Sequence, residues 1–308
     1  MIAYSIIIPH KNTPDLLQYC LDSIPVRDDV QVIVVDDNSD ADKVDFDRFP
    51  RWKGDNYECF FTKEGKGAGY ARNVGLGHVT GKWVLFIDAD DFLLPSAGEI
   101  FDEEKDTEAD IVFFRPKAVM LEDRTTPSKR VNVYNGFIDD YLHTGDEMAL
   151  RCRWFSPWSR FFRLEMIRDN DILFDEIKYS NDALFAVNTG TRAKKIAVRN
   201  ETYLCVTESK NSLTSNYLNK PGELMTRADA FFRAQLVVHG HGYPVHESVA
   251  LRFLRSLLLE DKKPFVLNFN RMREMGYKKR WLVHELFKGH SRKARIKRTV
   301  YAYLITGF

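Results

Sequence analysis

The segment KWVLFIDADDFLLP, residues 82–95, places three carboxylates at the end of an apolar run. Asp88, Asp90 and Asp91 follow five apolar residues, and the chain then becomes apolar again. Burying one unpaired carboxylate costs free energy, and clustering three adds mutual repulsion. A solvated turn is one explanation of this pattern. The other is a divalent cation that neutralises the cluster, and oxygen ligands of this kind suit Mg²⁺ or Mn²⁺.

The composition is that of an ordinary globular protein. The 308 residues suffice for one large α/β domain with an extension, or for two domains. The net charge of +1 gives no overall attraction to nucleic acid. The charge is nevertheless uneven, because residues 278–298 carry nine Lys or Arg against one Glu.

The cysteine content and the hydropathy of the sequence indicate the cellular compartment of the protein. Cys20, Cys59, Cys152 and Cys205 are far apart and form no CxxC pair, so reduced structural thiols are the simplest account. No apolar run approaches the roughly 20 residues that span a bilayer, and the N-terminus lacks the basic segment of a signal peptide. We therefore expect a cytoplasmic protein that is not an integral membrane protein.

The first 115 residues alternate short apolar runs with amphipathic segments. The runs are rich in Val, Ile and Phe and apolar on both faces, which is typical of buried parallel strands. They predict strands at residues 4–8, 31–35, 58–62, 83–87 and 110–114. Thr13 and Pro14 suit the start of a helix after the first strand, and residues 67–79 predict a glycine-interrupted helix before the fourth. This alternation predicts a doubly wound, mostly parallel α/β sheet flanked by helices.

Polar residues follow three of these strands, at 9–12, 36–39 and 88–91. Ligands of open parallel sheets bind at the carboxyl ends of the strands, so the three clusters predict one ligand site.

The second half of the chain has a looser pattern. Residues 117–136 predict a strand pair with a polar turn, and residues 163–169 predict a helix. A further helix is expected with Ser180 or Asn181 as its N-cap residue, and strands are expected within 194–207. From Pro221 onward the pattern is helical, so we expect a C-terminal helical extension.

Five segments in matching order carry a resemblance to a known family. They are SIIIPHKN (5–12), QVIVVDDNSD (31–40), GAGYARNVGL (67–76), GKWVLFIDADDFLLP (81–95) and SPWSRFFRLEMI with ILFDEIKYSNDALF (156–185). Together they resemble the family 2 glycosyltransferases, over roughly residues 4–215. The resemblance implies a Rossmann-like GT-A domain at 1–215, with a donor half at 1–115 and an acceptor half at 116–215. A helical region with a basic amphipathic tail then occupies 216–308.

The resemblance also implies a nucleotide-sugar donor, usually a UDP-sugar, and Mn²⁺ or Mg²⁺ as cofactor. Asp37 then accepts a hydrogen bond from the base, and Asp36 holds the loop. Asp90 and Asp91 are the expected metal ligands, with Asp88 on the ribose or behind the metal ligands. The implied donor-binding residues are Pro9, Lys11, Asn12, Asp36, Asp37, Arg72, Asn73, Asp88 and Asp90. A surface salt bridge is the alternative for Arg72.

On the acceptor side, the resemblance implies a catalytic base at a helix start, which is Asp182 here. Its alternative is a helix-cap Asp. Trp158 is expected to line the acceptor cleft, although a core position suits it equally. Two departures from the family pattern stand out. Lys11 replaces an aromatic residue, which puts the nucleotide in doubt, and Asn181 replaces the first acid of the pair, which leaves Asp182 as its only carboxylate.

The resulting prediction is an inverting glycosyltransferase that acts on a glycan or lipid-linked acceptor in surface polysaccharide synthesis. Residues 278–308 combine basic and aromatic residues, so we expect peripheral contact with an anionic membrane at the inner face of the cell membrane, and no nucleic-acid partner. A solvated basic helix is the alternative. Two other functions stay open. One is an inactive nucleotide-sugar-binding protein. The other is a haloacid dehalogenase-type phosphohydrolase, which FIDADDF also resembles, although such enzymes usually carry that motif near the N-terminus.

Overall fold

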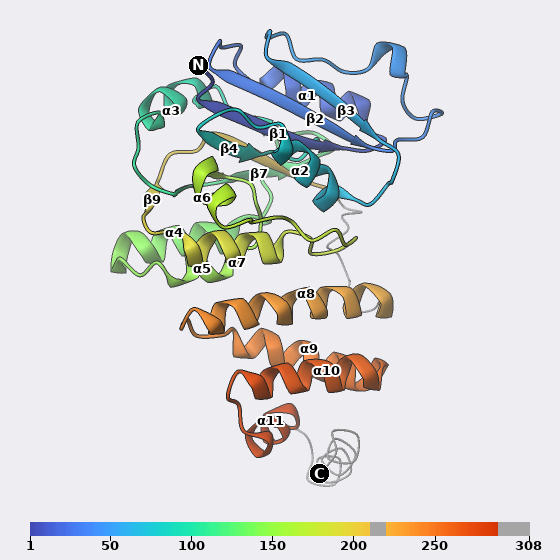
Figure 1. Cartoon of the computed structure of the whole chain (residues 1–308), viewed down its shortest axis with the longest axis vertical. Helices are drawn as coiled ribbons and strands as arrows, with labels where there is room; N and C mark the ends of the chain where they lie inside the picture. The colour runs from blue at the N-terminus through green and yellow to red at the C-terminus, as the bar shows by residue number, and fades with distance from the viewer. Residues whose placement is uncertain (210–219, 289–308) are drawn as a thin grey trace. The chain divides into compact units, whose positions relative to one another are not determined.

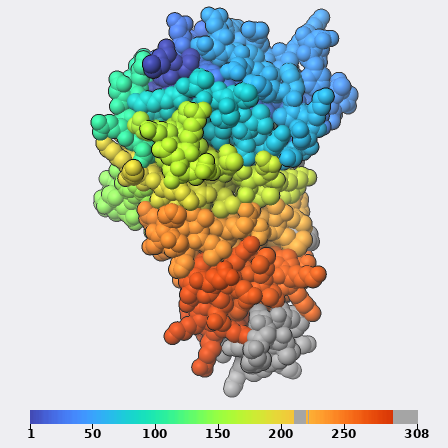
Figure 2. All heavy atoms as spheres, viewed as in Figure 1, coloured from blue at the N-terminus to red at the C-terminus, as the bar shows by residue number. Residues whose placement is uncertain are grey.

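The computed structural model describes residues 1–209 and 220–288. The chain divides after residue 212 into two compact units. Within the described residues, no helix combines the length and the apolar character needed to cross a membrane. The four cysteines are free thiols. In the space-filling view the first unit runs from blue to yellow along the chain, and the described residues of the second unit run from orange to red (Figure 2).

A seven-stranded sheet forms the centre of the first unit (Figure 1). Its order is β3 (Tyr57–Thr62), β2 (Val30–Asp37), β1 (Tyr4–His10), β4 (Trp83–Phe86), β8 (Arg160–Arg163), β6 (Ile111–Phe114) and β9 (Ile196–Arg199). The five predicted strands are confirmed, and the first four pair in parallel as expected. Strand β8 was not predicted. It runs antiparallel between β4 and β6.

Helices cover the sheet because the connections between its parallel strands must cross over it. The helices α1 (Pro14–Ser23), α2 (Ala68–Gly77) and α3 (Ala97–Glu104) provide these connections. Thr13 is the N-cap residue of α1 and Pro14 its first residue, as predicted. Helix α2 lies close against β1, since a Cβ added at Gly75 would come within 2.6 Å of the Ile7 side chain.

A second, three-stranded sheet corrects one prediction. It consists of β5 (Phe92–Leu93), β10 (Leu204–Glu208) and β7 (Lys117–Met120). The strand pair predicted at 117–136 is only partly right. After a turn, Pro127 forms an antiparallel bridge with Val119 of β7, but the main partner of β7 is β10, and the chain then forms α4 (Asn132–Thr144). The physical reason is the spacing of Tyr134, Phe137, Ile138 and Tyr141, which places an apolar stripe on one side of a helix that packs against the core.

Three short helices complete the first unit, namely α5 (Met148–Arg153), α6 (Leu164–Asp169) and α7 (Ala183–Arg192). Helix α6 and strands β9 and β10 agree with the predictions. Helix α7 begins one or two residues later than expected, with Asp182 as its N-cap residue. Ser180 has a φ of 56°, which belongs to a turn and not to a helix.

The second unit is helical, as the pattern after Pro221 predicts. Its helices are α8 (Pro221–Gly240), α9 (Glu247–Glu260), α10 (Lys262–Glu274) and α11 (Lys279–Leu286). Helix α11 buries Leu282, Val283 and Leu286, so this part of the basic segment packs its apolar side inside the unit. Residues 289–308 of the predicted basic tail lie outside the described residues, and its contact with a membrane stays a prediction.

Two glycines of α2 give a matched test of how closely this helix is packed. A Cβ added at Gly69 would lie 2.0 Å from the Asp175 carbonyl oxygen, whereas nothing lies within 4 Å of one added at Gly77. We expect Gly69→Ala to destabilise the protein by about 1–3 kcal/mol through overpacking. Gly77→Ala should be neutral or stabilising by up to about 1 kcal/mol. Urea unfolding measures both, and equal effects would contradict the close approach of α2 to residue 175.

Candidate active site

The carboxyl ends of β1, β2 and β4 bring the three predicted polar clusters to one edge of the sheet. These strands are neighbours in the order β2-β1-β4 and all run in the same direction (Figure 1). His10 lies directly beside Asp36 in the register, and Ile7 lies beside Phe86, just before the acidic segment. The sheet therefore brings residues from three distant parts of the sequence to one edge, which is where ligands of open parallel sheets bind.

Asp36 holds the loop after β2. His10 Nδ1 lies 2.7 Å from Asp36 Oδ2, and Ser39 donates to the same carboxylate from its backbone N and its hydroxyl, at 2.9 and 2.6 Å. Burial raises the pKa of Asp36, but the hydrogen bonds from His10 and Ser39 outweigh it, so the pKa lies below its ordinary value. An ionised Asp36 therefore ties β1 to the β2 loop.

Asn12 joins the same two loops from the other side. Its backbone N donates to Ser39 Oγ at 2.8 Å, and its side chain exchanges two hydrogen bonds with Asp40. Its φ of 58° is one that Asn adopts more readily than most residues. Pro9, two residues before Lys11, lies within β1 beside Val35. These residues shape this edge of the sheet.

Asp37 has a carboxylate oxygen without a partner. The residue is 3% exposed, and its Oδ2 accepts a hydrogen bond from Gly67 N at 2.8 Å. Lys11 Nζ donates to the Asp37 carbonyl at 3.0 Å and lies 3.8 Å from Oδ2. Oδ1 is buried and, among the described residues, has no hydrogen-bond partner. A buried acceptor left in this state indicates that a ligand donor completes it.

The three acidic residues after β4 form a cluster. Asp88, Asp90 and Asp91 can each offer an oxygen within 4.8 Å of the others. Asp91 is 1% exposed, accepts from Thr207 N at 2.7 Å through Oδ1, and has no partner for Oδ2 among the described residues. Burial and then the neighbouring carboxylates raise the pKa of Asp90 and of Asp91. The orphaned oxygen and the all-oxygen donor set fit a divalent cation.

Arg72 links this cluster to the acceptor side. Its guanidinium donates to Asp88 at 2.6 Å and to Asn181 Oδ1 at 3.0 Å. The salt bridge considered from the sequence is present, but it is partly buried, because Arg72 is buried and Asp88 is partly exposed. Asn73, by contrast, makes two hydrogen bonds with the backbone of Phe174. Its Nδ2 donates to the carbonyl at 3.0 Å, and its Oδ1 accepts from the backbone N at 2.8 Å, so both polar ends of the side chain have partners within the protein.

Asp182 stands at the N-terminus of α7, and its carboxylate makes no capping hydrogen bond. Its backbone oxygen accepts from Ala186 N at 2.9 Å, as that of an N-cap residue does. Burial raises the pKa of Asp182, while the positive charges of Arg72 and Arg160 oppose the rise. The carboxylate is therefore available for a task other than capping.

Trp158 lies in the core of the first unit. It is 3% exposed, and its ring packs edge-on against Tyr134 at 4.9 Å and against Trp154 at 6.3 Å. This is the core position that the sequence also allowed. Its role on the acceptor side stays a prediction.

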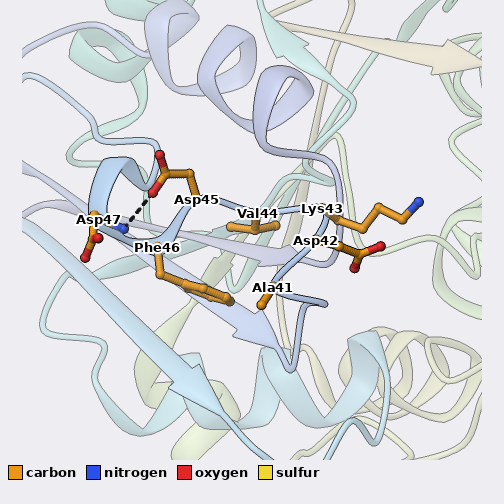
Figure 3. Close-up of a pocket in the computed structure, with 7 residues that line it drawn as sticks. All are labelled: Ala41, Asp42, Lys43, Val44, Asp45, Phe46 and Asp47. Atoms are coloured by element: carbon orange, nitrogen blue, oxygen red, sulfur yellow. Dashed lines mark hydrogen bonds between the residues drawn. The ribbon is translucent and has the colours of Figure 1, made fainter.

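A surface hollow is lined by a different set of residues (Figure 3). Its lining comes entirely from residues 41–47, the loop after β2, where Asp47 N donates to the Asp45 carboxylate at 3.1 Å. The hollow contains none of the predicted site residues, so it is not the candidate site.

Sequence reasoning missed two residues that shape the site. Thr207 on β10 donates to the Asp91 carboxylate and, through its hydroxyl, to the Asp90 carbonyl at 3.1 Å. Arg130 in turn donates to the Thr207 carbonyl at 2.6 Å, and its charge opposes the rise in the pKa of Asp90. Neither residue belongs to a local motif, because long-range pairing of β7 with β10 brings them there.

The raised pKa of Asp182 predicts how stability depends on pH. A carboxyl whose pKa is raised in the folded state contributes stability while protonated, and loses it as the pH rises through that pKa. Asp182→Asn removes this loss. We expect the variant to melt roughly 2–4 °C above the wild type at about pH 8, because about 1 kcal/mol has this effect on a domain of this size. Near pH 4 the two proteins should have the same melting temperature.

Thermal melts between these pH values test this prediction, with Asp36→Asn as the control of opposite sign. The pKa of Asp36 is lowered, so its ionised form stabilises the fold and its loss should lower the melting temperature at high pH. A melting temperature of Asp182→Asn below that of the wild type at about pH 8 would contradict the burial argument.

Comparisons with known proteins agree with this geometry. The family model described as glycosyl transferase family 2 matches residues 5–168. The poly(ribitol-phosphate) beta-glucosyltransferase of Bacillus spizizenii is 28% identical over 201 residues, which are 63% of this chain and 30% of that protein. This chain spans about a third of the length of such curated relatives.

Two solved structures share the fold. Staphylococcus aureus TarS 1-349 in complex with UDP-GlcNAc superposes with a TM-score of 0.55 at 18% identity, covering 94% of this chain and 93% of that one. The mannosyltransferase PcManGT from Pyrobaculum calidifontis, in complex with GDP-Man and Mn²⁺, gives 0.51 at 16% identity, covering 98% and 79%. The fold is thus similar to that of GT-A glycosyltransferases, and with the family model matching more than half of its residues, the chain belongs to glycosyltransferase family 2.

Proposed function

We propose that this protein transfers a sugar from a nucleotide-sugar, a UDP-sugar in the first instance, to a glycan or lipid-linked acceptor in the synthesis of a surface polysaccharide. One observation carries the proposal. Two buried carboxylate oxygens, Asp37 Oδ1 after β2 and Asp91 Oδ2 after β4, have no hydrogen-bond partner among the described residues, and these two strands flank β1 in one sheet. A nucleotide with a cation-bound diphosphate supplies the groups that both oxygens need. Structural neighbours bind UDP-GlcNAc in one case and GDP-Man with Mn²⁺ in another.

On the donor side, residues 1–115 form the binding half. Asp37 Oδ1 accepts an N–H from the base, and Lys11 contacts the nucleotide where the family usually has an aromatic ring. Pro9, Asn12 and Asp36 set the position of this edge. Residues 116–215 then form the acceptor half, and 216–308 a helical region whose basic tail contacts an anionic membrane surface.

Asp90 and Asp91 hold the divalent cation, Mn²⁺ or Mg²⁺. A cation bound there offsets the negative charge that develops on the leaving diphosphate. Asp91 is fixed by the Thr207 N–H, so its free oxygen is held in place. Asp88 is engaged by Arg72 at 2.6 Å, which keeps that arginine beside the donor. These contacts give Asp88 the supporting role in the cluster.

Asp182 is the base. The acceptor hydroxyl attacks the anomeric carbon, the bond from that carbon to the diphosphate oxygen breaks, and the hydroxyl proton passes to the Asp182 carboxylate. Attack from the side opposite the diphosphate inverts the configuration, through an oxocarbenium-like transition state. A base with a raised pKa holds the proton more firmly, and a carboxylate free of capping bonds can reach the hydroxyl.

An inactive nucleotide-sugar-binding protein is the second candidate, and the departures at Lys11 and Asn181 favour it. A phosphohydrolase fits less well, because the chain belongs to a transferase family and its acidic motif follows the fourth strand, not the first.

Donor binding is testable by thermal shift. We expect one nucleotide family among UDP-, GDP- and dTDP-sugars to raise the melting temperature with Mn²⁺ and much less with EDTA. A ligand at a hundred times its Kd stabilises the folded state by about 2.7 kcal/mol. Asp90→Asn and Asp91→Asn should lose the metal-dependent part. Asp123→Asn, in an exposed turn, is the matched control and should keep it. No shift with any donor would contradict the proposal.

The base role is tested by turnover. With the donor found above, we expect Asp182→Asn to lower kcat by about 10²–10⁴-fold, the usual contribution of a positioned base, with donor affinity unchanged. Release of the nucleoside diphosphate, with water or a glycan as acceptor, measures the rate. Asp171→Asn is the matched control, since Asp171 is exposed and lies before the same segment. If Asp182→Asn turned over the donor as fast as an active wild type, Asp182 would not be the base. If neither protein released nucleoside diphosphate faster than the background without enzyme, the inactive protein would be favoured.

A further inference from the structure

Arg160 on β8 is a buried arginine with little hydrogen bonding. It is 0% exposed, and its Nη2 donates to the Ser156 carbonyl. Its Nε and Nη1 have no partner among the residues that the structure describes. The rings of Phe113 and Phe162 flank the guanidinium at 5.5 and 4.8 Å. A charge buried in this way is costly unless an opposite charge lies close to it.

The packing of β8 against α7 places that opposite charge. Phe162 follows Arg160 by two residues and so shares its face of the strand, whereas Phe185 follows Asp182 by three and shares its side of the helix. The rings of Phe162 and Phe185 lie 5.3 Å apart. Arg160 and Asp182 therefore stand on the two surfaces that face each other.

Tyr134 on α4 closes the cluster. Its hydroxyl lies 2.8 Å from Ser156 Oγ, and Ser156 is the residue whose carbonyl accepts from Arg160. Arg160 influences both Tyr134 and Asp182 electrostatically, and both of them influence Arg160. The cluster thus contains one cation, one carboxyl and one phenol.

Four charged or titratable groups surround Asp182. Arg72 on α2, Asp88 after β4 and Arg160 on β8 act on its carboxyl, and Tyr134 on α4 is influenced by it. Arg72 already forms an ion pair with Asp88, at 2.6 Å. Within the described residues, Arg160 forms no ion pair of its own, so its charge acts on Asp182 together with that of Arg72.

We propose that Arg160 is a positioning residue whose buried positive charge keeps the Asp182 carboxylate ionised, so that the carboxylate can accept a proton. This inference rests on the proposed role of Asp182 as the base. Burial raises the pKa of Asp182 and the charge of Arg160 opposes that rise, so the loss of Arg160 leaves a larger fraction of the base protonated and inactive.

The test is a carboxyl ¹³C NMR titration of protein labelled at aspartate, with EDTA and without donor, in which Asp182→Asn identifies the Asp182 signal. Arg160→Met replaces a buried charge by an apolar side chain of similar length, a change that folded proteins often tolerate. We expect the Asp182 pKa to rise by about one unit, a tenfold change in proton affinity. An unchanged Asp182 pKa in folded Arg160→Met overturns the proposal.

Arg163→Met is the matched control on the same strand. Its guanidinium donates to the carbonyls of Thr107 and Ala109, so the Asp182 pKa should stay at the wild-type value. An equal rise in both variants would assign the effect to general disturbance of β8 and overturn the proposal.

If Arg160→Met does not fold, the proposal is tested with Arg160→Lys, which keeps the positive charge at this position. Its Asp182 pKa should then lie within about 0.3 unit of the wild type, and a rise of about one unit would overturn the proposal. The titration uses neither donor nor acceptor, so its failure is distinct from failure of the proposed function, which the rate of Asp182→Asn decides. The acidic limb of kcat/KM against pH should move by the same amount as the NMR pKa.

Discussion

Carboxylates buried at the ends of parallel strands are the constraint on which the site depends. Nearly all residues of β1, β2 and β4 are buried, so the sequence of these strands is mostly apolar and the polar groups gather where the strands end. Asp37 and Asp91 are almost wholly buried there, and each has one oxygen that accepts from a backbone N–H and one without a partner among the described residues. A folded chain tolerates this cost only where something else offsets it. A ligand that brings hydrogen-bond donors and a cation would offset the cost of burying these carboxylates.

The strands next to this site could be predicted because their periodicity is local. Five apolar runs predicted five strands, and all are present. The errors lie where distant pairing decides. Val131 and Val133 favour a strand, yet the apolar stripe from Tyr134 to Tyr141 packs on the core as a helix. The short β8 carries aromatic and basic residues that give no alternation, and it forms a strand because β4 and β6 both offer it an edge.

Some residues of the site could be predicted from local motifs, and others could not. The motifs located Asp36, Asp37, Arg72 and the acidic cluster, which the structure gathers at one edge of the sheet. The other residues are brought to the site by contacts between segments that are distant in the sequence. Thr207 fixes Asp91 from a strand more than a hundred residues away. Phe162 of β8 packs against Phe185 of α7, which sets Arg160 and Asp182 on facing surfaces. The structure also shows structural contacts that the motifs alone do not reveal. Asn73 hydrogen-bonds to the backbone of Phe174, and Trp158 packs in the core.

The central claim is that the sheet edge at the ends of β1, β2 and β4 binds a nucleotide and a divalent cation together. The most direct measurement is a crystal structure of the protein grown with UDP and Mn²⁺, with data collected at the manganese absorption edge. The account predicts one anomalous peak against the carboxylates of Asp90 and Asp91, with the uracil N–H donating to Asp37 Oδ1. Manganese bound elsewhere, for instance on the acidic loop at residues 41–47 (Figure 3), or a nucleotide that leaves Asp37 without contact, would contradict it.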